Sequence, residues 1–303
     1  MKQLPKISII MNCYNSDSFL KEAIDSVYEQ TFTDWEIIFW DNVSTDDSAV
    51  IAKSFNEKLR YYLAEKNTNL GEARNLALQK ARGKYICFLD CDDLFLKNKL
   101  SMQYRIMENN AYAMCYGSTA IINSEGKISR KEQVRCTSGQ VFKHLLDRYE
   151  IKMVSVMIRH SVLKDNNLWF ASHLKFCPDH NLFMEIASRY NVGVISQFIA
   201  QYRVQVNSLS RQTLDLASVE IKYTLDKILK RDESINIKYP CEVKSAYSKL
   251  SYYDAIYYIY QNDYAKASNK ILKIYSNKWQ YKIIYVLLLL RIPKNLLLRI
   301  LKR

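Results

Sequence analysis

Three carboxylates crowd the end of an apolar run in the first third of the sequence. The segment "YICFLDCDDLF" runs from Tyr85 to Phe95 and places Asp90, Asp92 and Asp93 within four positions. Like charges at this spacing repel one another and lose hydration when they pack beneath an apolar strand. A cation or another positively charged partner would relieve that cost, so the cluster favours a cation-binding site. The alternatives are a solvated acidic turn and, for Asp93, a helix N-cap.

Polar residues also follow two earlier strands of the predicted fold. "KISIIMNCYN" places Asn12 and Tyr14 after one strand, and "WEIIFWDN" ends a second strand on Asp41. Ligands of parallel α/β sheets bind outside the carboxyl ends of the strands. These residues and the acidic cluster are therefore expected along one rim, where a nucleotide would lie. The alternatives are a turn residue for Asp41 and a packing aromatic for Tyr14.

Strands and helices alternate through the first hundred residues, which predicts an α/β fold with a doubly wound, parallel sheet. Strands are expected at 6–15, 35–42, 59–65 and 84–90, and helices at 16–30, 44–55, 69–83 and 97–109.

The rest of the chain is less regular at first and then all-helical. Strands are expected near 111–123, 152–160 and 192–204, helices near 140–148 and 178–190, and a polar stretch at 123–137. From about 211 onward only helices are expected, with 252–275 resembling a helical hairpin.

Composition indicates a packed globular protein with an uneven charge. The chain has 303 residues, 49% of them hydrophobic, and a net charge of +13. Residues 211–303 hold 18 Lys or Arg against 8 Asp or Glu, so +10 of that charge belongs to the last third. The seven cysteines form no CxxC pair, which favours a reducing cytosol over a disulfide framework or a zinc site.

Four ordered blocks resemble the inverting family 2 glycosyltransferases, which have a GT-A fold. They begin with "ISIIMNCYNSDSFLKEAIDSVYEQTFTDWEIIFWDNVSTDDS" and "NLGEARNLALQKARGKYICFLDCDDLF" and continue with "PDHNLFMEI" and "YRVQVNSLS". The resemblance implies a GT-A domain over 1–210, with a nucleotide-sugar half at about 1–110 and an acceptor half at about 111–210. Residues 211–303 would form a helical, basic C-terminal extension.

The resemblance implies a role for each candidate residue of the donor site. Asp90-Cys91-Asp92 matches the DxD motif, with Asp92 the expected ligand of Mn2+ or Mg2+ and Asp90 beside it. Asp41 matches the aspartate that binds the nucleobase. The remaining donor-binding candidates are Asn12, Tyr14, Arg74 and Arg203, of which Arg74 has the alternative of a surface charge.

Two departures from the family pattern concern the base and the metal. Asp179 matches the catalytic base that takes the proton of the acceptor hydroxyl, but Pro178 stands where a glutamate is usual. An acidic residue at a helix start is the alternative reading. Gln205 stands where many relatives have a metal-binding histidine, and a Gln carbonyl is a poorer ligand.

The C-terminal segment "WQYKIIYVLLLLRIPKNLLLRILKR" combines apolar residues with basic charges only. Its longest apolar run has eight residues, too few to span a bilayer. This pattern predicts contact with an anionic membrane surface, and the alternative is a terminal helix docked on its own domain. The expected protein is cytoplasmic and peripheral on the membrane. It would use a UDP-sugar as donor and a saccharide or lipid-linked saccharide of a bacterial surface glycan as acceptor.

Three other functions are alternatives to a glycosyltransferase. A nucleotidyltransferase would show a Gly-rich, basic loop after the first strand, and "NCYNSDS" has neither glycine nor lysine. A degenerate transferase could retain only nucleotide-sugar binding as a scaffold. Nucleic acid is not an expected partner, because the basic charge is interleaved with leucines in the tail.

Overall fold

The computed structural model describes residues 4–205, 208–277 and 279–301. The chain divides into two compact units. The first comprises Met1–Phe142 and Tyr149–Val206, and the second comprises Lys143–Arg148 and Asn207–Arg303.

The first unit is built on one mixed sheet with the strand order β3-β2-β1-β4-β8-β6-β9-β5, and β7 pairs with β6 outside this path. Strands β3, β2, β1 and β4 are parallel neighbours, whereas β8 is antiparallel to both β4 and β6. The strands are β1 (Ile7–Cys13), β2 (Trp35–Asp41), β3 (Leu59–Leu63), β4 (Tyr85–Phe88), β5 (Leu94–Phe95), β6 (Met114–Ile122), β7 (Ile128–Glu132), β8 (Met157–Arg159) and β9 (Val192–Arg203).

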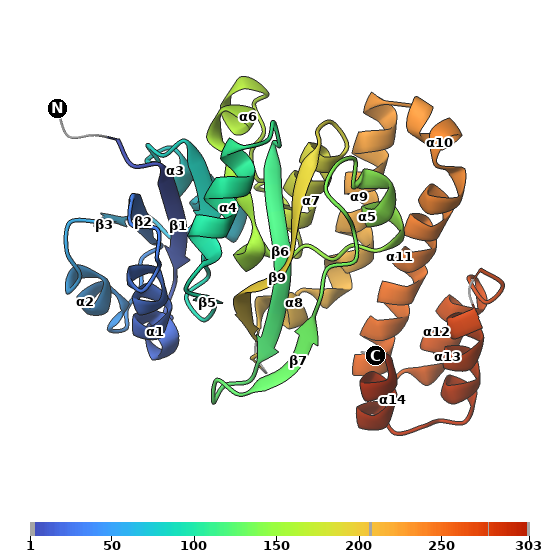
Figure 1. The fold of residues 1–303 in the computed structure, drawn as a ribbon. Coiled ribbons are helices and arrows are strands. Elements are labelled where there is room, and N and C mark those ends of the chain that lie inside the picture. Colours follow the sequence, from blue (N-terminus) through green and yellow to red (C-terminus); the bar gives the residue numbers. More distant parts are fainter. Residues whose placement is uncertain (1–3, 206–207, 278, 302–303) are drawn as a thin grey trace. The chain divides into compact units, whose positions relative to one another are not determined.

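Helices pack on the sheet and connect its parallel strands. Helix α3 packs on β1 and β2, and α4 packs on β6 and β9, which lie side by side in Figure 1. The helical elements of this unit are α1 (Asp17–Tyr28), α2 (Ser48–Lys53), α3 (Leu70–Leu78), α4 (Lys99–Glu108), the 3-10 helix η1 (Met153–Ser155), α6 (His160–Asp165) and α7 (Pro178–Ala187).

The predicted α/β class is confirmed, and the alternation of strands and helices over the first hundred residues appears as expected. The structure adds three elements that were not predicted, β5, β7 and α6. The strand expected at 152–160 is shorter than predicted. Residues 153–155 form the 3-10 helix η1, and only residues 157–159 form the strand β8.

The core of the first unit lies where α1 and the parallel strands meet. Its buried residues alternate along β1 as Ile7, Ile9 and Met11, and along β2 as Ile37 and Phe39. Side chains of a strand alternate between its two faces, so this face of the sheet is covered by the packed helix. The polar candidate residues lie outside this core, at the ends of the strands.

The regular elements of the second unit are all helices within its described residues. Its elements are α5 (Phe142–Asp147), α8 (Leu209–Gln212), the 3-10 helix η2 (Leu214–Leu216), α9 (Ala217–Arg231), α10 (Ser234–Lys238), α11 (Pro240–Tyr260), α12 (Tyr264–Leu272), α13 (Trp279–Leu289) and α14 (Lys294–Leu301). Helices α11 and α12 form the predicted hairpin, and α12 to α14 gather beside the end of α11 (Figure 1). None of the described helices is long and apolar enough to cross a membrane.

Candidate active site

The candidate residues of the first two strands reach one edge of the sheet because their strands are parallel neighbours. Cys13 pairs with Asp41 in the register of β1 and β2, so Asn12 lies one residue before that pair. Strand β4 pairs with β1 on its other side and leads directly into Asp90. The structure therefore places these ends at a common rim, as the parallel-strand rule predicts.

Asp41 is held firmly inside this rim. It is 1% exposed, its Oδ1 accepts the Ser44 backbone N–H at 2.8 Å, and its Oδ2 accepts the Tyr61 hydroxyl at 2.6 Å. Burial and this carboxylate together raise the pKa of Tyr61. The turn after Asp41 places Val43 at φ 68°, a left-handed conformation that costs a β-branched residue about 1–3 kcal/mol. The rim therefore contains a strained turn whose geometry the Asp41 carboxylate helps to maintain.

Asn12 has a side-chain donor without a partner among the described residues, and Tyr14 has a side chain that is largely exposed. The Asn12 Nδ2 is buried and has no hydrogen-bond partner among the described residues. An unpaired buried amide donor costs about 1–3 kcal/mol, a cost that an acceptor on a ligand would remove. Tyr14 is 55% exposed. The Cys91 thiol donates to the Asn12 carbonyl oxygen at 3.3 Å and ties the two loops together.

Asp90 is neutralised by an arginine from α3. The Arg74 Nη2 donates to the Asp90 Oδ1 at 2.9 Å, and the Arg74 side chain is buried while Asp90 stays partly exposed. The guanidinium lies over the Phe170 ring, 5.5 Å from its centroid. A surface charge, the alternative considered for Arg74, is thus wrong. Its guanidinium pairs with the first residue of the acidic loop, which comprises Asp90, Cys91, Asp92 and Asp93.

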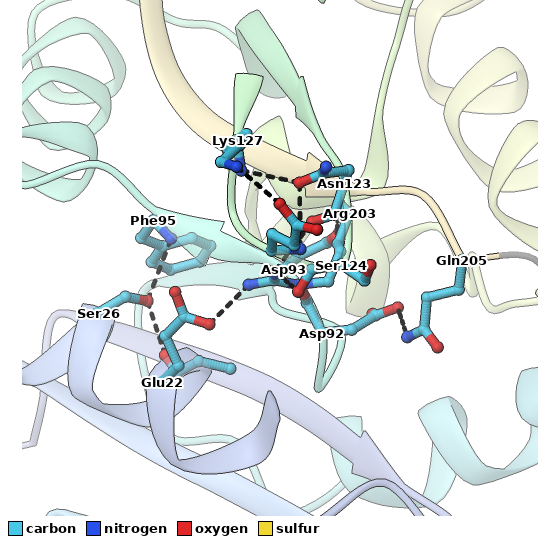
Figure 2. Close-up of polar contacts among 12 residues, drawn as sticks. Glu22, Ser26, Asp92, Asp93, Phe95, Asn123, Ser124, Lys127, Arg203 and Gln205 are labelled. Atoms are coloured by element: carbon cyan, nitrogen blue, oxygen red, sulfur yellow. Dashed lines mark hydrogen bonds and ion pairs between the residues drawn. The ribbon is translucent and has the colours of Figure 1, made fainter. Parts of the chain in front are cut away.

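Asp92, unlike Asp90, makes no ion pair with any of the residues that the structure describes. Burial and the neighbouring Asp90 raise the pKa of Asp92 above the ordinary aspartate range. The Gln205 side-chain amide donates to the Asp92 Oδ2 at 2.6 Å, as Figure 2 shows. The sequence proposed Asp90, Asp92 and Gln205 as metal ligands, and the structure brings Asp92 and Gln205 into contact while Asp90 pairs with Arg74.

Asp93 is a buried residue and not a helix cap. Helix α4 begins at Lys99, with Asn98 before it, so the N-cap alternative for Asp93 is wrong. Its Oδ1 accepts the Arg203 backbone N–H at 2.9 Å, while its Oδ2 is buried without a partner in the described part of the chain. Burial and the charges of Asp90 and Asp92 raise the pKa of Asp93 well above its usual range.

The Arg203 guanidinium is directed into the protein and away from solvent, with its side chain 1% exposed. Its Nε donates to the Asp92 carbonyl oxygen at 2.8 Å, and its Nη2 pairs with Glu22 Oε2 at 2.6 Å. Its Nη1 donates to the Asn123 carbonyl oxygen at 3.1 Å (Figure 2). The sequence predicted that Arg203 contacts the donor, but in this structure it fastens the acidic loop to α1 and to the turn after β6.

Asp179 lies in the first turn of α7, behind Pro178 at the helix start. Pro is well suited to this position because the first turn needs no donor from it. Burial raises the pKa of Asp179, while Arg74 and the backbone N–H groups of Asp179 and His180 oppose that rise. Because Arg74 and Asp90 both act on its pKa, Asp179 belongs to the same electrostatic cluster as the acidic loop.

The donor groups of this loop fit a divalent ion that is shared with a ligand. No group of three His, Cys, Asp or Glu side chains within the described ranges is arranged to hold a metal by itself. Mg2+ usually keeps several waters and is bound by one or two carboxylates together with substrate phosphates. Asp92, whose pKa is raised by a neighbouring negative charge, provides such a carboxylate, and the Gln205 carbonyl oxygen is an acceptable second ligand.

Three residues that support the acidic loop, Glu22, Asn123 and Cys91, carry no signal of this role in the sequence. Glu22 looks like an ordinary exposed position of α1, and it lies 181 residues from Arg203. Asn123 contributes a backbone carbonyl, which no residue type reveals. Cys91 resembles a small core hydrophobe, and only the fold shows that its thiol joins the β1 and β4 loops.

Comparison with known structures identifies the fold class. The mannosyltransferase PcManGT from Pyrobaculum calidifontis, solved with GDP-Man and Mn2+, matches over 97% of this chain and 87% of its own, with a TM-score of 0.62 and 14% identity. S. aureus TarS 1-349, solved with UDP-GlcNAc, matches over 88% of this chain and 89% of its own, with a TM-score of 0.59 and 18% identity. The fold is the GT-A fold.

Sequence comparison identifies the family. The family model described as glycosyl transferase family 2 matches residues 8–163, which is about half of the chain, and the chain belongs to this family. The matched range includes Asp41, Asp90 and Asp92 but ends before Asp179 and Arg203.

Among relatives, the E. coli protein WfgD is 30% identical over 67% of this chain and 79% of its own length. It is named as a UDP-Glc:alpha-D-GlcNAc-diphosphoundecaprenol beta-1,3-glucosyltransferase. An uncharacterized glycosyltransferase of Rickettsia felis is 34% identical over 66% of this chain. The chain spans only 33% of the length of that relative.

Proposed function

We propose that this chain is an inverting glycosyltransferase that moves a hexose or aminohexose from a UDP-sugar to a bacterial surface glycan or a lipid-linked saccharide. The observation that carries the proposal is the assembly of Asn12, Asp41 and the Asp90–Asp92 loop at the ends of three neighbouring strands. The name of the E. coli relative, with its UDP-linked donor and lipid diphosphate acceptor, supports the same classes of donor and acceptor.

Each residue of the rim has a proposed task in donor binding. The Asn12 Nδ2, which has no partner among the described residues, donates to an acceptor atom of the nucleoside, and the Asp41 carboxylate accepts from the base through its remaining lone pairs. Tyr14, which is largely exposed, covers the base. Arg74 keeps Asp90 in place by their ion pair and adds positive charge near the diphosphate.

Asp92 and Gln205 are the residues that would hold a Mn2+ or Mg2+ ion. When bound, the ion acts as a Lewis acid that stabilises the negative charge of the departing nucleoside diphosphate. Gln205 now donates its amide to Asp92, and a rotation of that amide would turn its carbonyl oxygen toward the cation. Arg203 and Glu22 are positioning residues, since the arginine holds the Asp92 backbone and the glutamate holds the arginine.

The transfer itself requires one proton acceptor and no enzyme nucleophile. The acceptor hydroxyl oxygen forms a bond with the anomeric carbon while the bond from that carbon to the diphosphate oxygen breaks. The Asp179 carboxylate takes the hydroxyl proton, as a general base does. A raised pKa makes this carboxylate a stronger base than an ordinary aspartate.

Calorimetric titration of UDP, GDP and dTDP, each with and without Mn2+, tests the donor site. We expect metal-dependent binding of UDP, and we expect Asp92→Asn to weaken it by at least about 10- to 100-fold, as loss of metal-site groups commonly does. Asp25→Asn is the matched control, because Asp25 is a partly exposed residue of α1 whose side chain pairs with Lys21 on the same helix.

Two results would contradict this proposal. One is the absence of binding of all three nucleotides to a folded chain, which would remove the donor site. The other is equal loss of affinity in Asp92→Asn and Asp25→Asn, which would show that the acidic loop is not involved.

We further propose that the protein is cytoplasmic and contacts an anionic membrane through α13. The buried face of this helix consists of Tyr281, Ile284 and Leu288. The other side exposes an apolar stripe formed by Trp279, Ile283 and Val286 of α13 and by Leu290, the residue that follows the helix. A helix that is apolar all round is usually buried in a protein or a membrane, and the neighbouring charges, Lys282, Arg291 and Lys294, are all basic.

A further inference from the structure

A pocket lies within the helical unit, and none of the candidate residues of the donor site line it. It has a volume of about 310 Å³ and is formed by the segment that opens this unit and by the end of α11. Small-ligand sites commonly have volumes of about 300–1,000 Å³. Tyr257, Tyr260 and Gln261 line it from α11 and the residue after it.

The charges of this pocket balance. Arg211 and Asp215 line it together with the neutral residues Gln212 and Leu214, so one positive and one negative side chain face the same space. The surrounding segment 211–303 has a net charge of +10. Because the Arg211 and Asp215 charges offset each other, neither an anionic nor a cationic ligand gains a net attraction in this pocket, which favours a neutral ligand.

Ring faces and solvent-accessible polar groups both line the pocket. Tyr257 and Tyr260 are three residues apart on one helix, where side chains are neighbours, and both are half-buried. Among the residues that the structure describes, no hydrogen bond is made by their hydroxyls or by the side chains of Asp215 and Gln261. The pocket thus presents apolar faces with adjacent donors and acceptors.

This combination matches the chemistry of a neutral sugar. A pyranose ring has an apolar C–H face that packs on an aromatic ring, and hydroxyls that both donate to and accept from amides and carboxylates. Two hydrogen bonds hold the α11 backbone at this pocket: Lys294 Nζ donates to the Tyr260 carbonyl oxygen at 3.3 Å, and the Gln261 N–H donates to the Tyr257 carbonyl oxygen at 3.1 Å.

We propose that this pocket is a saccharide-binding site for a neutral portion of the acceptor glycan. The role of this site in sugar transfer rests on the proposed function, whereas the binding of a saccharide to it does not. The proposed site requires no contribution from the donor rim, so the two can be tested separately in the full chain.

The test is binding of the full chain to an array of neutral bacterial surface oligosaccharides. The strongest ligand is then titrated into the wild type and variants. We expect Tyr260→Ala and Asp215→Asn to weaken binding about tenfold each, and Tyr260→Phe, which keeps the ring, to weaken it less. Ile237→Ala, at an exposed position of α10, is the control, and thermal melts verify folding of each variant.

The outcomes separate this inference from the proposed function. A chain that binds UDP but no neutral oligosaccharide on the array overturns the inference and leaves the donor site intact. A chain that binds an oligosaccharide through Tyr260 but binds no nucleotide supports the inference and overturns the transferase proposal. UDP or inorganic phosphate binding that is lost in Tyr260→Ala overturns the neutral class of ligand. We expect Asp92→Asn to retain oligosaccharide binding.

Discussion

At the scale of single residues, the proposed base depends on a neighbouring arginine. Burial raises the pKa of Asp179, and the Arg74 charge is the largest influence that lowers it. A base works only when deprotonated, so the rate falls as the pH drops through its pKa. The acidic side of the rate profile should therefore lie at higher pH than for an ordinary aspartate.

Replacing the arginine gives a prediction with a definite sign. Arg74→Met removes the charge that lowers the pKa of Asp179, so the acidic side of the kcat profile should move to still higher pH. The measurement is kcat against pH for sugar transfer with saturating donor. Asp179→Asn should lose the transfer rate at every pH. An unchanged profile in a folded, active Arg74→Met variant would remove Asp179 from the role of base.

The sequence predicted which residues lie at the rim, but it did not predict which side chains hold them in place. Asp41, Asp90 and Asp92 directly end or follow strands, and the rule for parallel strands brings such positions together. No comparable rule places Arg203, because its direction depends on how β9 enters the sheet beside β6. Because Arg203 is an arginine, the sequence suggested that it binds the diphosphate. In the structure it packs inside the protein and holds the acidic loop in place.

At the scale of elements, the join between α3 and β4 depends on one close approach. A Cβ atom on Gly83 would lie 2.5 Å from the Ser8 backbone nitrogen and 2.8 Å from the Ile7 carbonyl carbon. Backbone atoms of β1 cannot move aside as a flexible side chain can. The Gly83 N–H also donates to Ser8 Oγ at 2.8 Å, so a shift would break this bond.

We expect Gly83→Ala to lower the free energy of unfolding by roughly 3 kcal/mol, at the upper end of the usual overpacking range. Gly126→Ala is the matched control, because a Cβ on Gly126 would lie in open space. Its left-handed φ of 76° alone should lower the free energy of unfolding by about 1 kcal/mol. Urea unfolding of both variants gives the comparison. Equal losses would show that the contact with β1 is relieved by backbone movement.

Element prediction failed where the physical signal was missing. Strand β7 has the sequence "ISRKE" and is almost wholly exposed, so it lacks the alternation of apolar and polar residues that marks a strand. Strand β5 has only two residues. Helix α6 begins directly after β8, with no loop residues to separate the two patterns.

At the scale of the whole molecule, the apolar stripe of α13 predicts lipid binding. We expect the protein to cosediment with phosphatidylglycerol vesicles and less with phosphatidylcholine vesicles, since each basic residue near an anionic surface contributes about 1 kcal/mol. Added salt should weaken this binding.

The variant that tests the stripe is the triple substitution Ile283→Ser, Val286→Ser and Leu290→Ser, which leaves the buried face of α13 unchanged. It should lose vesicle binding, whereas Ile237→Ser, at another exposed apolar position, should not. Retention of binding by the triple variant in a folded protein would remove α13 from the proposed membrane contact.

The sequence predicted the class of the whole fold but not the composition of its sheet. Alternating strands and helices correctly predicted the parallel group β3-β2-β1-β4. The antiparallel insertion of β8 between β4 and β6 brings together strands separated by long and irregular segments. Periodicity in a sequence reports which residues are buried, and it does not report which strands are neighbours.

The Arg203 contacts also have a consequence for synthesis of the chain. The pair with Glu22 joins residues 181 positions apart, and contacts of such separation form late because the loop between them must first be closed. A nascent chain can complete β1, β2 and β4 long before residue 203 leaves the ribosome. The acidic loop then lacks its anchor, so the donor site reaches its final geometry only after β9 has been added.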